Sequence, residues 1–430
     1  MASVSCVIIP DMISKKFIYK FLILICVSLF CSCTSKAEKI QNKKERLMRK
    51  SALEIHSYVQ NVKNQKEERF DRFVKILPLK WKISQLFMEN LEGNLTFRTY
   101  ENYSVMTGNK EDENEPLLAG GYLFFSYNLA DSLEETKFYI STLRWLSFKC
   151  NGLQPLLAID QEGGYVNRLK KLTGGLPSQQ MVSETLSVSE AYELYADQAV
   201  KMREIGFDMN LAPVIEVCTA DNQDFLNGRS FGDIEKVKSY GLACVNAYEN
   251  NGIGAVIKHF PGNTNTDPHT GLPEISLNKD EFYALLEPFK YVTFHEPAGI
   301  IMSHARVLSE PQDSGIPACL SYFWVTKMLR REYGYNGIIF SDDIFMAALA
   351  ENGYPPETAC IMAIEAGVDC IMLSEKRFGK TAAVLYKKAL SDSEFEEKIN
   401  EAAKRVLLYK LKCGLITENL VDHCLEVYGR

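Results

Sequence analysis

Short apolar runs that alternate with amphipathic stretches are the feature that most restricts how this chain can fold. From about Leu77 onward the runs are apolar throughout rather than alternating, which is typical of strands buried on both faces of a parallel sheet. Strands that alternate with helices predict an α/β fold. We expect strands at 121–125, 155–159, 210–214, 255–258, 299–303, 337–341 and 370–373, and helices at 187–205, 234–250, 279–294, 322–333 and 357–366.

The number of these units favours a closed barrel over an open sheet. Seven or eight strand–helix units match a (β/α)8 TIM-type barrel, which takes about 250 residues and can exceed 400 with insertions. The chain has 430 residues, and no internal repeat or low-complexity segment interrupts the region. We therefore predict a single catalytic domain over residues 76–430.

Polar residues lie at the carboxyl ends of four of the expected strands. They are Asp160, the pair Lys258-His259, the pair Ser303-His304 and the pair Asp342-Asp343. In a barrel of this kind the carboxyl ends of the strands form the catalytic face. Any one of these residues could simply cap a strand end. The repetition at four strands predicts that they converge on one site.

Three motifs carry the chemistry expected at this face. The first, DQEGGYVNR, begins at Asp160, a carboxylate that can accept hydrogen bonds from vicinal sugar hydroxyls; the alternative is a tight strand-to-helix turn. The second, KHFPG, precedes Asp267 and His269, where a carboxylate can orient an imidazole for general acid/base work. The third places Asp342 after a buried strand, where it can act as a nucleophile toward an anomeric carbon.

Charge and cysteine content exclude some classes of function. The net charge is −7 and the body of the chain has no large basic block, which argues against nucleic-acid binding. The twelve cysteines form no CxxC pair and no Cys/His cluster with zinc-site spacing. We expect neither a metal nor an organic cofactor. The sequence gives no indication of the oligomeric state.

The first 75 residues have the character of an export signal and a tether. Three lysines precede the apolar run 21–30, which is too short for an ordinary transmembrane helix, and the run leads into Cys33. We interpret residues 1–33 as a signal peptide with a relaxed lipobox, with Cys33 lipidated; ordinary signal cleavage without a lipid is the alternative. Residues 34–75 are strongly charged and are interpreted as a tether and leading helix, or as a plain solvated spacer. This predicts a membrane-anchored lipoprotein of the bacterial periplasm or cell surface.

Taken together, the motifs resemble glycoside hydrolase family 3 in its single-domain β-N-acetylhexosaminidase branch. LLAIDQEGG, GRSFGD, KHFPG, DPHTGLP and GIIFSDD occur in the family's order, between about Trp81 and about Leu373. The resemblance implies a retaining enzyme that removes terminal N-acetylglucosamine from cell-wall fragments or chitin-like oligosaccharides. Residues 374–430 are expected to close the barrel rather than to form a second sandwich domain.

The resemblance also implies a role for each matching residue. Asp342 matches the catalytic nucleophile, and His269, paired with Asp267, matches the unusual general acid/base of this branch. The residues that match the sugar-binding set are Asp160, Arg168, Arg229, Lys258 and His259.

Two departures from the family's pattern concern the leaving-group side. The segment 263–266 is shorter than in typical members and lacks a second His-Gly, and Phe345 stands where a small polar residue is usual.

Two alternatives stay open beside the hexosaminidase. One is a β-glucosidase or β-xylosidase of the same fold, and the other is a non-catalytic sugar-binding lipoprotein. Phosphate in place of water as the acceptor also stays open.

Overall fold

The computed structural model describes residues 48–49, 57, 60–61, 64–268, 270–310, 313–374 and 378–429. The chain divides into two compact units, Met1–Arg69 and Phe70–Arg430. The described residues of the first unit are helical. The second unit begins with helical residues 70–76, whose apolar side chains Phe70, Phe73 and Val74 are buried in its core. No helix among the described residues has the length and apolar character needed to span a membrane.

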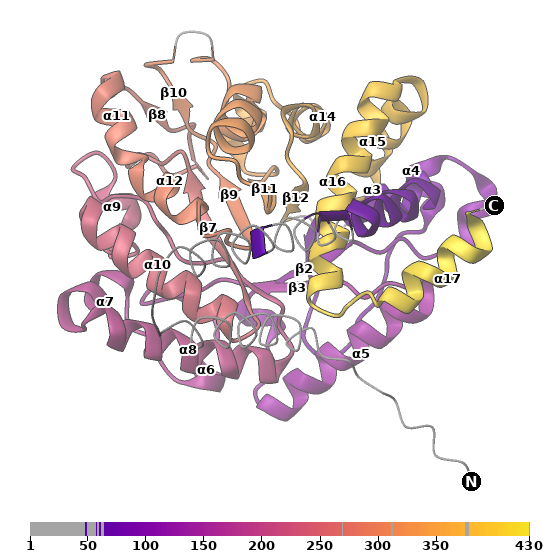
Figure 1. The fold of residues 1–430 in the computed structure, drawn as a ribbon, viewed down its shortest axis with the longest axis horizontal. Coiled ribbons are helices and arrows are strands. Elements are labelled where there is room, and N and C mark those ends of the chain that lie inside the picture. The colour runs from indigo at the N-terminus through magenta and orange to yellow at the C-terminus, as the bar shows by residue number, and fades with distance from the viewer. Residues whose placement is uncertain are drawn as a thin grey trace, which may run out of the picture. The chain divides into compact units, whose positions relative to one another are not determined.

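The second unit is built on a closed barrel of eight parallel strands (Figure 1). The order around the barrel is β1-β12-β11-β9-β7-β6-β3-β2, with every neighbouring pair parallel. The strands are β1 (Phe87–Asn90), β2 (Gly121–Phe124), β3 (Leu156–Ile159), β6 (Met209–Asn210), β7 (Gly254–Phe260), β9 (Gly299–Met302), β11 (Ile338–Asp343) and β12 (Cys370–Leu373). The predicted (β/α)8 fold is confirmed.

Strands β7 and β11 end two residues later than predicted, at Phe260 and Asp343, and two other strands differ more from the sequence prediction. Strand β1 was not predicted, because its sequence Phe-Met-Glu-Asn ends in two polar residues and has no turn residue before it. Strand β6 is shorter than the expected 210–214 and is followed only by an isolated bridge between Val214 and Lys258. Pro213 lies within that segment and has no N–H to donate to a ladder.

Helices surround the strands and connect one to the next (Figure 1). They are α3 (Leu79–Gln85), α4 (Tyr103–Thr107), α5 (Leu133–Asn151), α6 (Lys170–Thr173), α7 (Gln179–Thr185), α8 (Val188–Ile205), α9 (Gln223–Leu226), α10 (Ile234–Asn250), α11 (Lys279–Leu285), α12 (Glu287–Thr293), the π-helix η4 (Phe323–Glu332), α13 (Ala347–Glu351), α14 (Pro356–Ala366), α15 (Gly379–Ser391), α16 (Ser393–Lys412) and α17 (Glu418–Tyr428). Short 3-10 helices lie at η1 (Lys110–Asn114), η2 (Ser126–Asn128) and η3 (Ala318–Leu320).

The helix limits follow local sequence signals. Ser187 caps α8 by accepting from the Glu190 N–H, and the Glu190 carboxylate returns to the Ser187 N–H, so both ends of this capping box are satisfied. The prediction of a single helix at 279–294 is wrong, because the structure has two helices there. The segment divides at Leu286 into α11 and α12, and Pro288 lies in the first turn of the second helix.

Two short ladders lie outside the barrel, at the carboxyl ends of its strands. Strand β4 (Gln161–Gly163) pairs antiparallel with β5 (Val166–Asn167), and β8 (Glu274–Ile275) pairs parallel with β10 (Arg306–Val307). Both ladders fix loops that leave the strands β3, β7 and β9.

The barrel interior is an apolar core closed at one end by a helix. Alternate side chains from all eight strands form one buried cluster, and Val406 and Tyr409 of α16 belong to the same cluster. The Tyr409 hydroxyl donates to the Asp208 carbonyl, just before β6, at 3.2 Å. Helix α16 therefore covers the amino-terminal end of the barrel, and the opposite end, where the polar strand-end residues lie, is left for a site.

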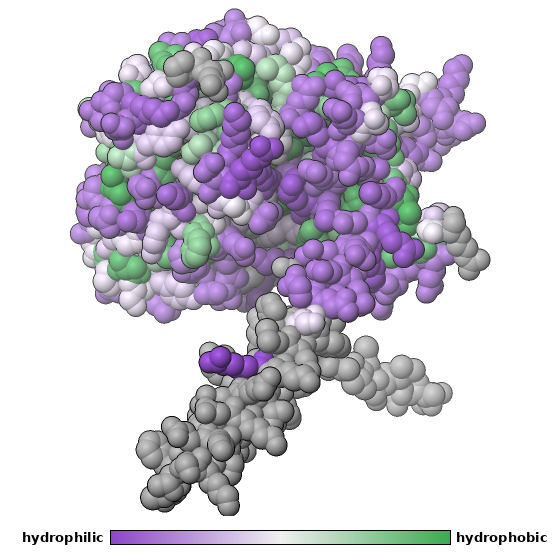
Figure 2. Space-filling model, turned by 45° about the horizontal axis from the view of Figure 1, so that its top comes forward, coloured by the Kyte–Doolittle hydropathy of each residue, from purple (hydrophilic) through white to green (hydrophobic). Residues whose placement is uncertain are grey.

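The two ends of the second unit meet at the barrel wall. Helices α15 and α16, yellow in Figure 1, contact α3 and α4 near its beginning. The face in Figure 2 is mainly hydrophilic with scattered hydrophobic residues, as expected for a surface exposed to water.

Candidate active site

A lysine joins two carboxylates at the carboxyl ends of β3 and β7. The Lys258 ammonium lies 2.5 Å from Asp160 and 2.6 Å from Glu162. Burial alone would lower the pKa of Lys258, but the charges of Asp160 and Glu162 outweigh burial and raise the pKa. The ammonium therefore stays protonated at neutral pH and holds Asp160 at the rim of the barrel.

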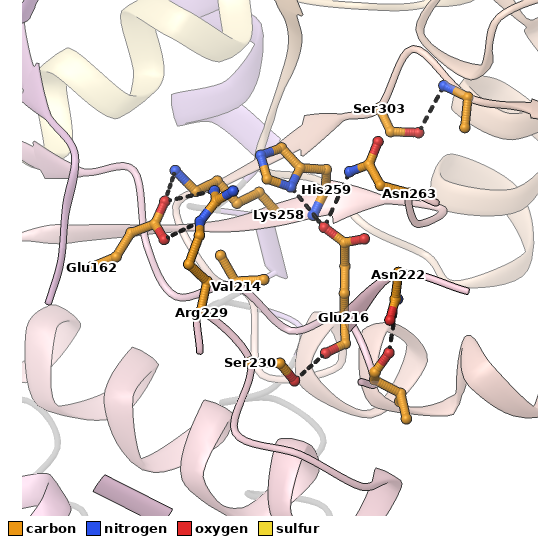
Figure 3. A network of polar contacts seen from close by, with 12 residues as sticks. Glu162, Val214, Glu216, Asn222, Arg229, Ser230, Lys258, His259, Asn263 and Ser303 are labelled. Carbon is orange, nitrogen blue, oxygen red and sulfur yellow. Dashed lines mark hydrogen bonds and ion pairs between the residues drawn. The ribbon is translucent and has the colours of Figure 1, made fainter. Parts of the chain in front are cut away.

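The Glu162 carboxylate contacts two cations, Lys258 and Arg229, as Figure 3 shows. Its carboxylate accepts from Arg229 Nε at 2.7 Å and Nη2 at 2.9 Å, and from Lys258. Burial alone would raise the pKa of Glu162, but Lys258 and Arg229 outweigh burial and hold the pKa well below its usual range. A buried carboxylate thus stays ionised, and it links the predicted residues Arg229 and Lys258.

A second carboxylate fixes the imidazole of His259. Glu216 Oε1 accepts from His259 Nδ1 at 2.7 Å, from the His259 backbone N–H at 3.2 Å and from the Asn263 amide at 3.2 Å (Figure 3). A carboxylate oxygen can only accept here, so Nδ1 carries the hydrogen in this contact. The ring is oriented by a residue that the sequence analysis did not select.

Asp342 has a backbone conformation that is rare for a residue with a side chain. Its φ is +64°, in the left-handed region, at the carboxyl end of β11. One carboxylate oxygen, Oδ1, accepts from the Asp343 N–H at 2.8 Å. Such strained conformations concentrate at functional sites, where the surrounding structure holds them in place.

The neighbouring acid, Asp343, is bonded into the wall of the barrel. Its Oδ1 accepts from the N–H groups of Phe345 and Ser374, both at 3.0 Å. The Ser341 hydroxyl contacts the Asp342 carbonyl and accepts from the Met372 N–H at 3.1 Å. Of the two adjacent acids, Asp342 is therefore the one whose side chain is not committed to β12 and the loop that follows it.

Within the described part of the chain, no hydrogen bond or ion pair is seen that joins Arg168 or Asp267 to Lys258, Asp160 or Glu162. Arg168 packs over the Phe125 ring, 5.7 Å from its centroid, and its Nε has no hydrogen-bond partner among the described residues. Asp267 is exposed and its carbonyl closes a turn by accepting from Thr270 and Gly271. His269 and Cys33 lie outside the described residues. Among the described contacts, none joins Asp342 directly to Lys258.

A cavity of about 460 Å³ lies beside Glu216. Its walls are the loop after β6, residues 261–266 after β7, the segment 274–277, and apolar side chains of α11 and α12. Its volume falls in the range of small-molecule sites, roughly 300–1,000 Å³. Within the part of the chain that the structure describes, no cluster of three metal-binding side chains occurs.

Three site residues were not selected from sequence. Glu162 stands inside the first motif, and Glu216 follows the apolar run that ends at Ile215. The rule that polar residues follow strands could have found Glu216, had the expected strand 210–214 been extended by one residue to Ile215. His304 was noted at a strand end but received no role.

A parallel barrel whose carboxyl end carries paired carboxylates, lysine, arginine and histidine has the form of a barrel enzyme's active site. The model of the family described as "Glycosyl hydrolase family 3 N terminal domain" matches residues 79–408, and the chain belongs to this family.

Similar proteins carry hexosaminidase names. The chain is 29% identical to "Beta-hexosaminidase A" of Pseudoalteromonas piscicida over 68% of its own length, and it spans about half (53%) of that relative. It is also 29% identical to a "Beta-hexosaminidase" of Idiomarina loihiensis, over 70% of this chain and 92% of the relative. Among solved structures, a glycoside hydrolase family 3 β-N-acetylglucosaminidase from Paenibacillus sp. str. FPU-7 is similar with a TM-score of 0.70 and 26% identity, covering 82% of this chain and 69% of that one.

Proposed function

We propose that this protein is a retaining exo-β-N-acetylhexosaminidase that removes terminal N-acetylglucosamine from cell-wall fragments or chitin-like oligosaccharides. The observation that carries the proposal is the Asp342 carboxylate, held in a left-handed conformation at the end of β11 on the same face as the Lys258–Asp160–Glu162–Arg229 cluster. The names of the relatives in family 3 support the choice of sugar.

In the proposed reaction Asp342 attacks the anomeric carbon while the glycosidic C–O bond breaks. The leaving oxygen takes a proton from His269, which Asp267 orients. Water then attacks the same carbon and gives its proton to His269, and the bond to Asp342 breaks. Two inversions retain the anomeric configuration.

The sugar-binding role is proposed for Asp160, Arg168, Arg229, Lys258 and His259. Lys258 and Arg229 are held by Glu162, and His259 by Glu216, so these side chains are oriented before a substrate arrives. Such preorganisation removes part of the entropy cost of binding.

We also propose that residues 76–430 form the catalytic domain, that residues 34–75 tether it, and that Cys33 anchors it to a membrane facing the periplasm or cell surface.

The test compares release of p-nitrophenol from the β-N-acetylglucosaminide and from the β-glucoside by the full chain and by Asp342→Asn. We expect turnover of the acetamido sugar alone, with a loss in the variant of at least about 1,000-fold at unchanged melting temperature. Asparagine tolerates the left-handed conformation, which makes it the matched replacement.

Other outcomes select the alternatives. Turnover of the glucoside instead of the acetamido sugar would make the protein a β-glucosidase or β-xylosidase. Turnover of neither would favour a sugar-binding lipoprotein.

The role of His269 is tested by His269→Ala on two further substrates. The variant should lose less activity on a 2,4-dinitrophenyl β-N-acetylglucosaminide than on chitobiose, because a good leaving group needs no proton. Equal losses on the two substrates would remove His269 as the acid.

A further inference from the structure

A buried histidine and cysteine lie behind the proposed nucleophile and have no part in the mechanism above. His304 follows β9 and Cys319 lies in the 3-10 helix η3; His304 is 1% exposed and Cys319 is fully buried. Backbone bonds hold their two segments together, since the Cys319 N–H donates to the Ser303 carbonyl at 3.1 Å and the Ala318 N–H to the Ala305 carbonyl at 2.9 Å.

The imidazole of His304 joins this pair to the nucleophile segment. His304 Nε2 lies 3.0 Å from the Asp343 carbonyl oxygen, and Nδ1 lies 3.2 Å from Cys319 Sγ. A carbonyl only accepts, so Nε2 carries a hydrogen. In the neutral ring Nδ1 then accepts from the thiol. Burial and the nearby Asp342 charge raise the pKa of Cys319, so its S–H is retained as the donor.

Asp343 connects His304 to Asp342 through two hydrogen bonds. Asp343 receives the His304 hydrogen bond at its carbonyl, while its N–H donates to Asp342 Oδ1 at 2.8 Å. A rotation of Asp343 would therefore change the direction of the N–H that holds the carboxylate. It would also release the left-handed turn at Asp342.

We propose that His304 is a positioning residue: its Nε2–H fixes Asp343 and thereby the attacking geometry of Asp342, and the Cys319 thiol fixes the tautomer that donates this hydrogen bond. The proposal rests on Asp342 being the nucleophile. Small displacements matter at this position, since a 1 Å misplacement of a reacting group can cost about 100-fold in rate.

The test compares two replacements of His304 with opposite properties, assayed on the full chain with the p-nitrophenyl β-N-acetylglucosaminide. His304→Phe keeps a planar ring but has no donor, whereas His304→Gln keeps an N–H at about the position of Nε2. We expect His304→Phe to lower kcat about 100-fold with KM within about twofold of the parent value. The kcat of His304→Gln should be at least about tenfold higher than that of His304→Phe. A purely packing role predicts the reverse order, with Phe the better replacement, and that order would overturn the proposal.

Two replacements of Cys319 keep the proposal testable if the His304 variants fail to fold. Cys319→Ser keeps a donor and should stay near the parent kcat, whereas Cys319→Ala should fall about tenfold. Cys244→Ala, at another fully buried cysteine on α10, is the matched control and should leave kcat unchanged. Equal kcat values for Cys319→Ser and Cys319→Ala would contradict the thiol's role.

The two proposals fail in different ways. Activity retained in Asp342→Asn would remove the nucleophile and with it the proposed mechanism. An inactive Asp342→Asn together with a fully active His304→Phe would leave the mechanism standing and overturn only the positioning role.

Discussion

At the scale of single residues, the site depends on side chains that are each held by a specific partner. Lys258 is buried and Arg229 half-buried beside Glu162, and Glu162 would be an uncompensated buried charge without them. Removing one partner from such a set costs roughly 3–5 kcal/mol, because the remaining charge cannot be solvated. Lys258, Arg229 and Glu162 therefore form a unit, and single replacements among them report on folding as well as on the proposed sugar binding.

The left-handed turn at Asp342 predicts an unusual order of stabilities. At φ +64° a Cβ is unfavourable, so Asp342→Gly should be about 1 kcal/mol more stable than Asp342→Ala, with both inactive. Urea unfolding at pH 7 measures the difference. At the neighbouring Asp343, which is not among the residues with positive φ, alanine should be the more stable replacement. Alanine more stable than glycine at both positions would show that Asp342 is not strained.

At the scale of elements, helix α16 has a role that its amphipathic pattern does not reveal. Its carboxyl half covers the amino-terminal end of the barrel, where Val406 and Tyr409 join the interior core. Lys410 in the same turn is buried and donates to Gln85 of α3. Burial is the main cause that lowers the pKa of Lys410 to about 7.

This buried lysine predicts a stability that rises with pH. Below pH 7 the folded and the unfolded chain both carry the charge, so the full cost of burying it is present. Between about pH 7 and 10.5 only the unfolded chain stays protonated, and stability increases. Lys410→Met should therefore raise the free energy of unfolding by about 2–4 kcal/mol at pH 6, after the lost hydrogen bond to Gln85 is subtracted, and by less at pH 10.

The exposed Lys412 on the same helix is the control. It pairs with Glu249 at 3.0 Å, and Lys412→Met should change the free energy of unfolding by less than about 1 kcal/mol at either pH. A Lys410→Met variant that is no more stable than its parent at pH 6 would mean that the ammonium is compensated in the folded chain.

At the scale of the whole molecule, the proposed lipid anchor would decide where the protein resides but not how its barrel folds. Cys33→Ala should release the protein from membranes without changing the specific activity of the released protein, because the proposed anchor precedes the proposed catalytic domain 76–430 in the sequence. Fractionation and fatty-acid labelling measure this, with Cys31→Ala as the control. Lipid labelling that persists in Cys33→Ala, or that disappears in Cys31→Ala, would move the anchor to another cysteine.

The barrel could be predicted from the sequence because its signal is local and repeated. Each strand except β1 contains or adjoins a short apolar run, and several of the helices between strands begin at a capping residue. The carboxyl ends of parallel strands must lie on one side of a barrel. The positions of Asp160, Lys258, His259 and Asp342 on one face therefore followed from their places at the carboxyl ends of strands.

The partners of these residues depend on contacts that no local pattern encodes. Arg229 meets Glu162 across 67 positions, His259 meets Glu216 across 43, and His304 meets the Asp343 carbonyl across 39. Similarly, α16 covers the barrel because residues 201 positions apart, Asp208 and Tyr409, meet at its base. The sequence by itself determined seven of the eight strands, their order along the chain and the end of the barrel at which the candidate site residues lie. Only the tertiary structure decided which carboxylate pairs with which cation and which imidazole reaches the nucleophile segment, since burial makes those polar pairings necessary and closure of the barrel makes them possible.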